Sequence, residues 1–142
     1  MFLLDTNVVS EKRKLRPHGA VIGWLSSQAT EDIFVSAVTV AEIQAGIELT
    51  RLQDPRKAAE IEAWLLWMIS TTKILPITAE IAREWARMIH GRSRALAEDA
   101  WIAATAKCHH LTLATRNTKD FTGFGIDLFN PFEDTRQPAP VS

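Results

Sequence analysis

Phe2-Leu3-Leu4-Asp5-Thr6-Asn7 opens with three apolar residues and continues with three residues that cap helices or form turns. This change of character predicts a short strand that passes directly into a helix, with Asp5 at the junction. By its position alone, Asp5 is a helix cap. A capping carboxylate keeps further oxygen lone pairs, so capping does not prevent Asp5 from also binding a metal.

The alternation of short apolar strands and longer helices continues along the chain. Strands of this kind, separated by helices of ten or more residues, predict a parallel sheet with helices on both faces. We therefore expect an α/β fold, a single-domain three-layer α/β/α sandwich over residues 1–132, followed by a flexible tail at 133–142. The further strands are expected at 33–36, 73–77, 111–115 and 126–129, and the longer helices at about 39–52, 54–69, 78–90 and 97–109.

The composition is that of a globular protein, with 46% hydrophobic and 23% charged residues and a formal net charge of −1. This balance excludes a protein that binds nucleic acid by electrostatics alone, but it allows an enzyme that binds nucleic acid locally. The apolar runs are too short for a membrane span, and Asp5 comes too early for a signal peptide. The single cysteine, Cys108, excludes an internal disulfide framework and favours a cytoplasmic protein.

Glu42, near the start of a predicted helix, allows two readings. With Thr39 it fits a capping box, in which the glutamate reaches back to the N–H of the cap residue. It also shares a helix face with Ala45, Gly46 and Leu49, and an unpaired carboxylate on a buried apolar face is costly. The structural and the functional reading are equally open at this point.

Asp99 and the segment 115–120 provide further oxygen atoms. Asp99 lies in an almost wholly apolar helix, where aspartate is unfavourable, although the helix dipole favours an acid in the first turn. The segment Thr115-Arg116-Asn117-Thr118-Lys119-Asp120 is either a simple loop or a source of additional ligands. Both regions are expected at the edge where parallel strands end, which is also where Asp5 lies.

A group of carboxylates at one edge would need a cation. Two carboxylates about 4 Å apart repel each other by about 4 kcal/mol at an effective dielectric constant near 20. Oxygen ligands without a Cys or His cluster favour Mg²⁺ or Mn²⁺. Such a site supports metal-assisted hydrolysis of a phosphodiester.

Four blocks of the sequence resemble the signature blocks of PIN domains, and more narrowly those of the VapC/FitB branch of bacterial toxins. A single block is too short to be specific, but the four together, in this order and spacing, are highly specific. The closing segment 128–132 is similar to the C-terminal strand of that branch, so the resemblance covers about residues 2–132. The four blocks are residues 4–9, 36–43, 97–106 and 113–121.

The resemblance implies an α/β/α sandwich that binds Mg²⁺ or Mn²⁺ and cuts RNA, as the toxin of a toxin–antitoxin pair. The fourth acid differs among members, and we favour Asp120 over Asn117 because an amide brings no charge. The implied catalytic and metal-binding residues are Asp5, Glu42, Asp99 and Asp120, and the implied supporting residues are Thr6, Asn7, Thr115 and Asn117.

The resemblance also implies partners. A small antitoxin covers the active-site groove in this branch, and its N-terminal part binds promoter DNA. The toxin itself forms a homodimer or a hetero-oligomer with the antitoxin.

The basic stretch at 11–18 is either a solvated surface or an RNA contact near the site. Its candidate contacts are Lys12, Arg13, Lys14 and Arg16, together with Arg116, while Arg92 and Arg94 form a weaker second patch. Trp64 and Trp67 widen the apolar arc of their helix beyond one packing face, so they belong either to the core or to a partner surface. For Trp24, Trp85 and Trp101 we expect core positions.

Two other functions within the same fold are kept as alternatives. One is a nuclease that acts on DNA or flap structures, which the absence of a large inserted helical arch disfavours. The other is a catalytically silent partner-binding module, which the acids at 42 and 99 disfavour. An aspartyl phosphatase would need a second acid two positions after Asp5, where the chain has Asn7.

Overall fold

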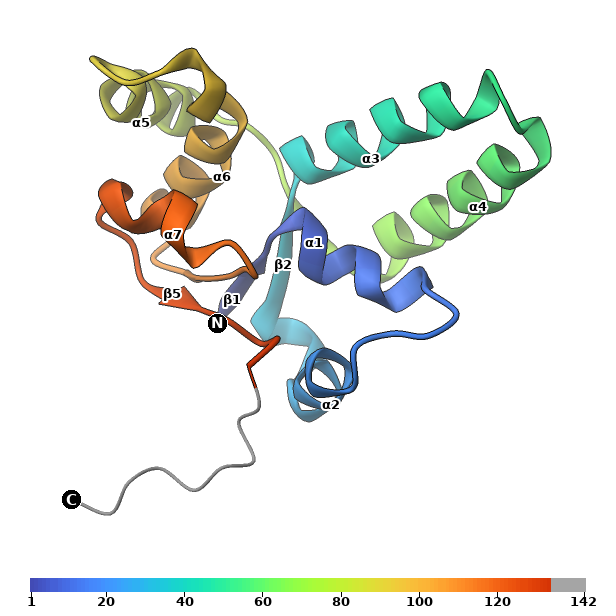
Figure 1. Cartoon of the computed structure of the whole chain (residues 1–142). Coiled ribbons are helices and arrows are strands. Elements are labelled where there is room, and N and C mark those ends of the chain that lie inside the picture. The colour runs from blue at the N-terminus through green and yellow to red at the C-terminus, as the bar shows by residue number, and fades with distance from the viewer. Residues whose placement is uncertain (134–142) are drawn as a thin grey trace.

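The computed structural model describes residues 1–133, and its strands form one parallel sheet in the order β3-β2-β1-β4-β5 (Figure 1). The strand at the start of the chain therefore lies in the middle, where Leu4 pairs with Val35 of β2 and with Ala114 of β4. The strands are β1 (Phe2–Leu4), β2 (Ile33–Ser36), β3 (Lys73–Leu75), β4 (Thr112–Ala114) and β5 (Leu128–Phe129). The helices are α1 (Thr6–Val9), α2 (Gly19–Ser27), α3 (Ala37–Arg51), α4 (Pro55–Thr71), α5 (Ala79–Ile89), α6 (Ala97–Cys108) and α7 (Thr118–Phe121).

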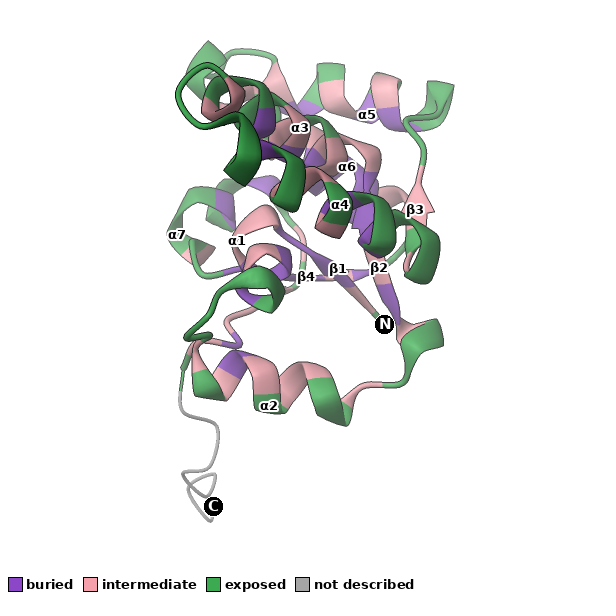
Figure 2. Ribbon diagram, turned by 90° about the vertical axis from the view of Figure 1, so that its right-hand side faces the viewer, coloured by how far each residue is buried: buried purple, intermediate pink, exposed green. Residues whose placement is uncertain are grey.

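Helices cover both faces of the sheet, as the predicted three-layer α/β/α sandwich requires. In Figure 1, α5, α6 and α7 lie on one side of the strands, and α3 and α4 project as a hairpin on the other. Figure 2 shows that buried residues concentrate on the strands and on the inward faces of the helices, while much of α2, α4 and α7 is exposed. The predicted fold class is confirmed.

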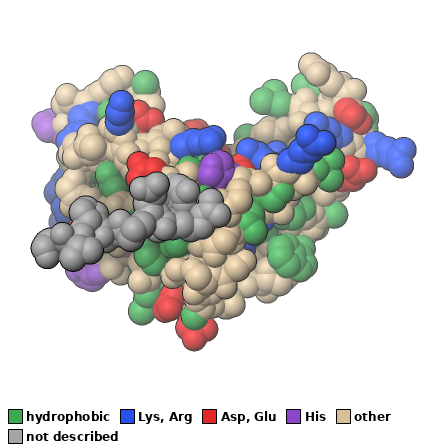
Figure 3. All heavy atoms as spheres, turned by 60° about the horizontal axis from the view of Figure 1, so that its bottom comes forward, with side chains coloured by type: hydrophobic (Ala, Val, Ile, Leu, Met, Phe, Trp, Pro, Cys, Tyr) green, Lys and Arg blue, Asp and Glu red, His purple; other side chains and the backbone are tan. Residues whose placement is uncertain are grey.

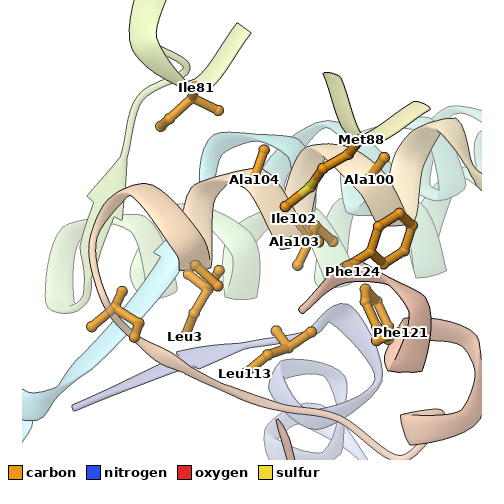
Figure 4. Packing of buried hydrophobic residues seen from close by; sticks show 12 residues of the cluster. Leu3, Ile81, Met88, Ala100, Ile102, Ala103, Ala104, Leu113, Phe121 and Phe124 are labelled. Carbon is orange, nitrogen blue, oxygen red and sulfur yellow. The ribbon is translucent and has the colours of Figure 1, made fainter. Parts of the chain in front are cut away.

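Successive strand residues point into two separate cores, because side chains alternate between the faces of a sheet. Leu3 and Leu113 pack with α5 and α6 in the first core. Leu4 and Ala114, the next residues along, pack with helices α1 to α4 in the second. Figure 4 shows Phe121, from α7, beside Leu113 in the first core. The helices on the two faces thus pack against the same two strands, β1 and β4.

An ion network around one buried carboxylate joins the two helices that cover the first core. Glu84 of α5, which is 7% exposed, accepts hydrogen bonds from Lys107 of α6 at 2.8 Å and from Arg87 at 2.6 Å. These bonds, that from Lys107 foremost, hold the pKa of Glu84 below its ordinary value. The network fixes α5 against α6, which carries Asp99.

Several element boundaries differ from those expected. Helix α3 begins at Ala37, because the Ser36 hydroxyl accepts a hydrogen bond from the Val38 N–H and caps it two residues early. Strand β3 ends before Pro76, which has no N–H for the sheet. Helix α2 was not predicted, since Pro17 and two glycines mask its pattern. No helix in residues 1–133 combines the length and apolar character of a membrane span.

The predicted tail, 133–142, lies outside the described residues except for Glu133.

Candidate metal centre

Asp5 lies at the end of the central strand, where it both caps α1 and faces the neighbouring strand. Its Oδ1 accepts the Thr6 N–H at 2.9 Å, and its Oδ2 accepts the Thr115 hydroxyl at 2.7 Å and the Asn7 amide at 3.2 Å. Burial raises the pKa of Asp5, these three hydrogen bonds lower it, and the charge of Asp120 raises it further. The net shift is upward. Asp5 is therefore a rigidly oriented carboxylate for which the charged form is unfavourable.

Glu42 reaches the same edge from the second turn of α3. Its Oε2 accepts the Thr6 hydroxyl at 2.8 Å, and the Thr6 oxygen lies 3.3 Å from the hydroxyl oxygen of Thr39. The capping-box reading is wrong, because Ser36 caps α3. The buried-face reading is also wrong, since Thr39, Ile43 and Ile47 form the buried stripe of this helix. Glu42 instead lies half-buried at the side of that stripe, turned toward α1.

Asp99 is the third residue of α6, in the first turn as predicted. Burial raises its pKa most, followed by the charges of Asp5, Asp120 and Glu98, and together they bring it to about 6. Within residues 1–133 its carboxylate accepts no hydrogen bond and joins no ion pair. The helix position explains why an acid is tolerated there, but it does not explain why this acid faces three others.

All four acids singled out in the sequence lie close enough for the charge of one to act on another. Asp120 of α7 raises the pKa of both Asp5 and Asp99, and Asp5 and Asp99 both raise that of Glu42. The sequence reasoning missed Glu98, whose charge acts on both Glu42 and Asp99. Glu98 stands directly before Asp99 in the first turn of α6, where the helix dipole alone would explain an acid.

The four acids form a shared rim and not a closed cage. Within the described residues, no three acidic, His or Cys side chains lie close enough to hold one metal ion. None of the Lys or Arg side chains in this part of the chain pairs with the four acids. The available ligand atoms are carboxylate oxygens whose negative charges repel one another. Oxygen ligands of this kind fit a hard divalent cation.

The supporting residues connect the strand ends. Asn7 donates to Asp5 and, through its Oδ1, accepts the Arg116 N–H at 3.1 Å. The Thr115 hydroxyl, besides holding Asp5, accepts the Asn117 N–H at 3.0 Å. The Asn117 side chain makes no hydrogen bond with any residue in 1–133, so that its predicted supporting role rests on the resemblance alone.

The predicted RNA contacts lie on an exposed segment directly after α1. Lys12, Arg13, Lys14 and Arg16 are all exposed, although Lys14 pairs with the buried carboxylate of Glu11. The guanidinium of Arg116 lies over the Phe132 ring, 4.1 Å from its centroid. Figure 3 shows Lys and Arg side chains along the hollowed edge between the two lobes of this face.

Arg92 and the tryptophans have largely structural positions. Arg92 donates to the Gly123 carbonyl at 2.5 Å and lies over the Phe124 ring, so it joins two loops and does not form a free basic patch. Trp85 and Trp101 stack at 4.5 Å beside the first core, and Trp24 packs against the second. Trp64 also packs against the second core, whereas Trp67 is 54% exposed.

Comparison with known proteins identifies the family of the chain. The model of the PIN domain family matches residues 2–124. The toxin FitB of Neisseria gonorrhoeae is 39% identical over 142 residues, which cover 94% of this chain and 100% of that protein. The VapC ribonuclease Y4jK of Sinorhizobium fredii is 34% identical over 140 residues, covering 94% and 99%. A toxin–antitoxin complex from Klebsiella pneumoniae contains a chain with a TM-score of 0.72 and 28% identity, and the match covers 94% of this chain and 99% of that one.

Proposed function

The chain belongs to the PIN domain family, in the branch of the FitB and VapC toxins, and on that premise we propose that it is a metal-dependent endoribonuclease. One observation carries the proposal. Asp5, Glu42 and Asp99 each have a pKa raised by burial and by the charge of neighbouring acids, Asp120 among them for Asp5 and Asp99, and no cationic side chain in residues 1–133 pairs with any of the four. Carboxylates with raised pKa values that lie together in this way mark a candidate functional site, and a bound cation would neutralise their repulsion.

In this proposal Asp5, Glu42, Asp99 and Asp120 supply the carboxylates for Mg²⁺ or Mn²⁺, and because such an ion keeps several water ligands it needs only one or two of them at a time. When bound, such an ion polarises the phosphodiester and activates a water molecule. The Thr115 and Asn7 side chains keep Asp5 in one orientation, and Thr6 does the same for Glu42. Asp99 must be deprotonated to act as a ligand, so activity requires a pH near or above its pKa of about 6, or a cation that lowers it.

The decisive experiment measures cleavage and metal binding separately. The purified protein is incubated with RNA and Mn²⁺, and Mn²⁺ binding is followed by calorimetry. We expect cleavage that stops with EDTA, and loss of both cleavage and binding in Asp5→Asn and Asp99→Asn. Asp127→Asn, which alters an exposed acid away from the rim, is the matched control. Equal cleavage by wild type and Asp5→Asn would refute the assignment, and cleavage of DNA in place of RNA would correct the substrate.

We further propose that the protein is the toxin of a toxin–antitoxin pair and acts in the cytoplasm, where its RNA substrate is found. A related protein is named toxin FitB, and a related chain is part of a toxin–antitoxin complex. In this role it would associate with a small antitoxin and contact promoter DNA only through it, alone forming a homodimer. Co-expression with a small reading frame upstream of its gene tests this role, and the expected result is a stable complex without ribonuclease activity.

A further inference from the structure

The four acids of the rim are held in place by different means. The Asp5 carboxylate accepts three hydrogen bonds, and the Glu42 carboxylate accepts one. Asp99 belongs to α6, a regular helix of 12 residues. Asp120 lies in α7, a helix of 4 residues, and within the described part of the chain its carboxylate accepts no hydrogen bond and joins no ion pair. The position of Asp120 therefore depends on what holds the backbone of its own short segment.

Two phenylalanines anchor that segment on its inner side. Phe121, directly after Asp120, and Phe124 are both almost fully buried. They lie in the first core beside Ala100 and Ala103 of α6, as Figure 4 shows. Apolar contacts of this kind hold the segment against α6, but they are not directional and do not fix how it is turned. A directional contact is needed to fix where the Asp120 carboxylate points.

Arg92 supplies a directional contact from the outer side. Its guanidinium donates a hydrogen bond to the carbonyl of Gly123 and lies over the ring of Phe124, 4.8 Å from the centroid. Arg92 thus holds the turn that follows Asp120 by one backbone group and one side chain. No carboxylate in residues 1–133 forms an ion pair with Arg92 that would draw it away from this turn.

The same arginine belongs to the part of the chain that leads to Asp99. Arg92 lies in the turn that follows α5, and its own N–H donates to the carbonyl of Ile89, the last residue of that helix, at 3.0 Å. The chain then continues through a short 3₁₀ turn into α6, which carries Asp99. The contact with Gly123 therefore joins the turn before the helix of Asp99 to the turn after Asp120. The charge of Asp120 acts on Asp99, so the two joined segments carry acids that lie near each other.

We propose that Arg92 is a positioning residue, which holds Asp120 in the place relative to Asp99 that metal binding requires. The inference rests on the proposed metal-dependent function and adds to it a residue that contacts neither the metal nor the RNA. Arg92 acts through the backbone of the turn at 121–124 and not through its charge. The charge alone would oppose a divalent cation, so that its removal would strengthen metal binding.

Gly123 allows the contact to be broken in a second way. A Cβ atom at this position would lie 2.5 Å from Nη1 of Arg92, closer than side-chain atoms pack. The atom that it meets ends a flexible, exposed side chain, so the guanidinium moves and the backbone stays. The φ of Gly123 lies outside the left-handed region, so alanine brings no backbone strain there. Gly123→Ala therefore displaces Arg92 without removing its charge.

The test measures Mn²⁺ binding by calorimetry without RNA, so that it does not depend on cleavage. We expect Arg92→Ala and Gly123→Ala each to weaken Mn²⁺ binding about three- to tenfold, less than the loss of a residue that bonds a ligand directly. The double variant should bind as weakly as either single variant, because both changes break the same contact. Arg92→Lys keeps a donor for the Gly123 carbonyl and should retain more of the affinity than Arg92→Ala.

Two controls separate positioning from charge and from stability. Arg94→Ala removes another exposed cation, which joins no ion pair within the described residues, and it should not weaken Mn²⁺ binding. Val21→Ala removes two buried methyl groups from the second core, on the other face of the sheet, and should lower the stability without changing the Mn²⁺ affinity. Hydrogen–deuterium exchange in residues 118–124 should quicken in Arg92→Ala and Gly123→Ala, and not in the two controls.

Unchanged or stronger Mn²⁺ binding in Arg92→Ala would overturn the inference. Additive losses in the double variant would also overturn it, since the two changes would then act through different contacts, and so would an equal loss in Val21→Ala. If Arg92→Ala does not fold by near-ultraviolet circular dichroism, Gly123→Ala against Val21→Ala decides the same question. None of these results affects the ribonuclease assignment, which fails if the wild type binds no Mn²⁺ or if Asp5→Asn cleaves RNA as the wild type does.

Discussion

Replacing Asp99 by asparagine should stabilise the metal-free protein at neutral pH while it abolishes metal binding. In the folded protein, burial and the charges of Asp5, Asp120 and Glu98 raise the pKa of Asp99 from 3.8 to about 6. In the unfolded chain these influences are absent. Above pH 6 the folded protein therefore carries a carboxylate in an unfavourable place, and asparagine has nearly the same shape without the charge.

The magnitude follows from the size of the shift. A change of about 2 pKa units corresponds to about 3 kcal/mol, and partial exposure of the side chain to solvent reduces this to about 1–2 kcal/mol. Between pH 3.8 and 6 the unfolded chain loses the proton while the folded protein keeps it. The free energy of unfolding of the wild type should therefore fall, relative to the variant, as the pH rises through this window.

Urea unfolding in EDTA measures this difference. We expect Asp99→Asn to be more stable than the wild type by about 1–2 kcal/mol at pH 7.5, with most of the gain gone near pH 4. Excess Mn²⁺ should stabilise the wild type and leave the variant unchanged. Asp127→Asn, a change of the same chemistry on the surface, should show no such pH-dependent gain. A loss of stability at pH 7.5, or an equal gain at both pH values, would refute the reasoning.

Three further outcomes are expected. Glu84→Gln should lower the free energy of unfolding by about 2 kcal/mol at pH 7. Its partners hold the pKa of Glu84 below 4.5, so the stability that Glu84 adds to the wild type is lost as the pH falls through its folded-state pKa. Urea unfolding at low pH measures this loss. Thr115→Val removes the hydroxyl that orients Asp5 and should weaken Mn²⁺ binding about 10- to 100-fold by calorimetry, whereas Thr105→Val, whose hydroxyl binds only a backbone carbonyl, should not. Leu65→Ala, at a side chain 1% exposed, should cost about 2–5 kcal/mol in urea unfolding.

The parallel sheet could be predicted because its evidence is local. Each strand contains a short apolar run, and several helices begin at a capping side chain, as at Asp5, Asp54 and Thr78. The convergence of the acids followed from one further rule, that parallel strands end at a common edge. Asp99 was also placed correctly, in the first turn of an apolar helix.

The surroundings of Glu42 could not be predicted in the same way. Which stripe of α3 is buried depends on how the helix is rotated against the sheet, and that is set by contacts with α4 and α6 that the sequence does not express. The apolar residues Ala45, Gly46 and Leu49 proved to be exposed. Glu98 was overlooked for a related reason, since its effect on Glu42 crosses from one helix to another.

The central position of β1 determines when the enzyme can become active during its own synthesis. The hydrogen bond that fixes Asp5 comes from Thr115, 110 residues further along the chain. During synthesis Asp5 and Glu42 leave the ribosome well before β4, the strand that completes the neighbouring pair, whereas Asp99 shortly precedes it. Pairings this distant in sequence also form slowly. The Asp5 corner of the acidic rim is therefore completed only when β4 has been synthesised and has paired with β1.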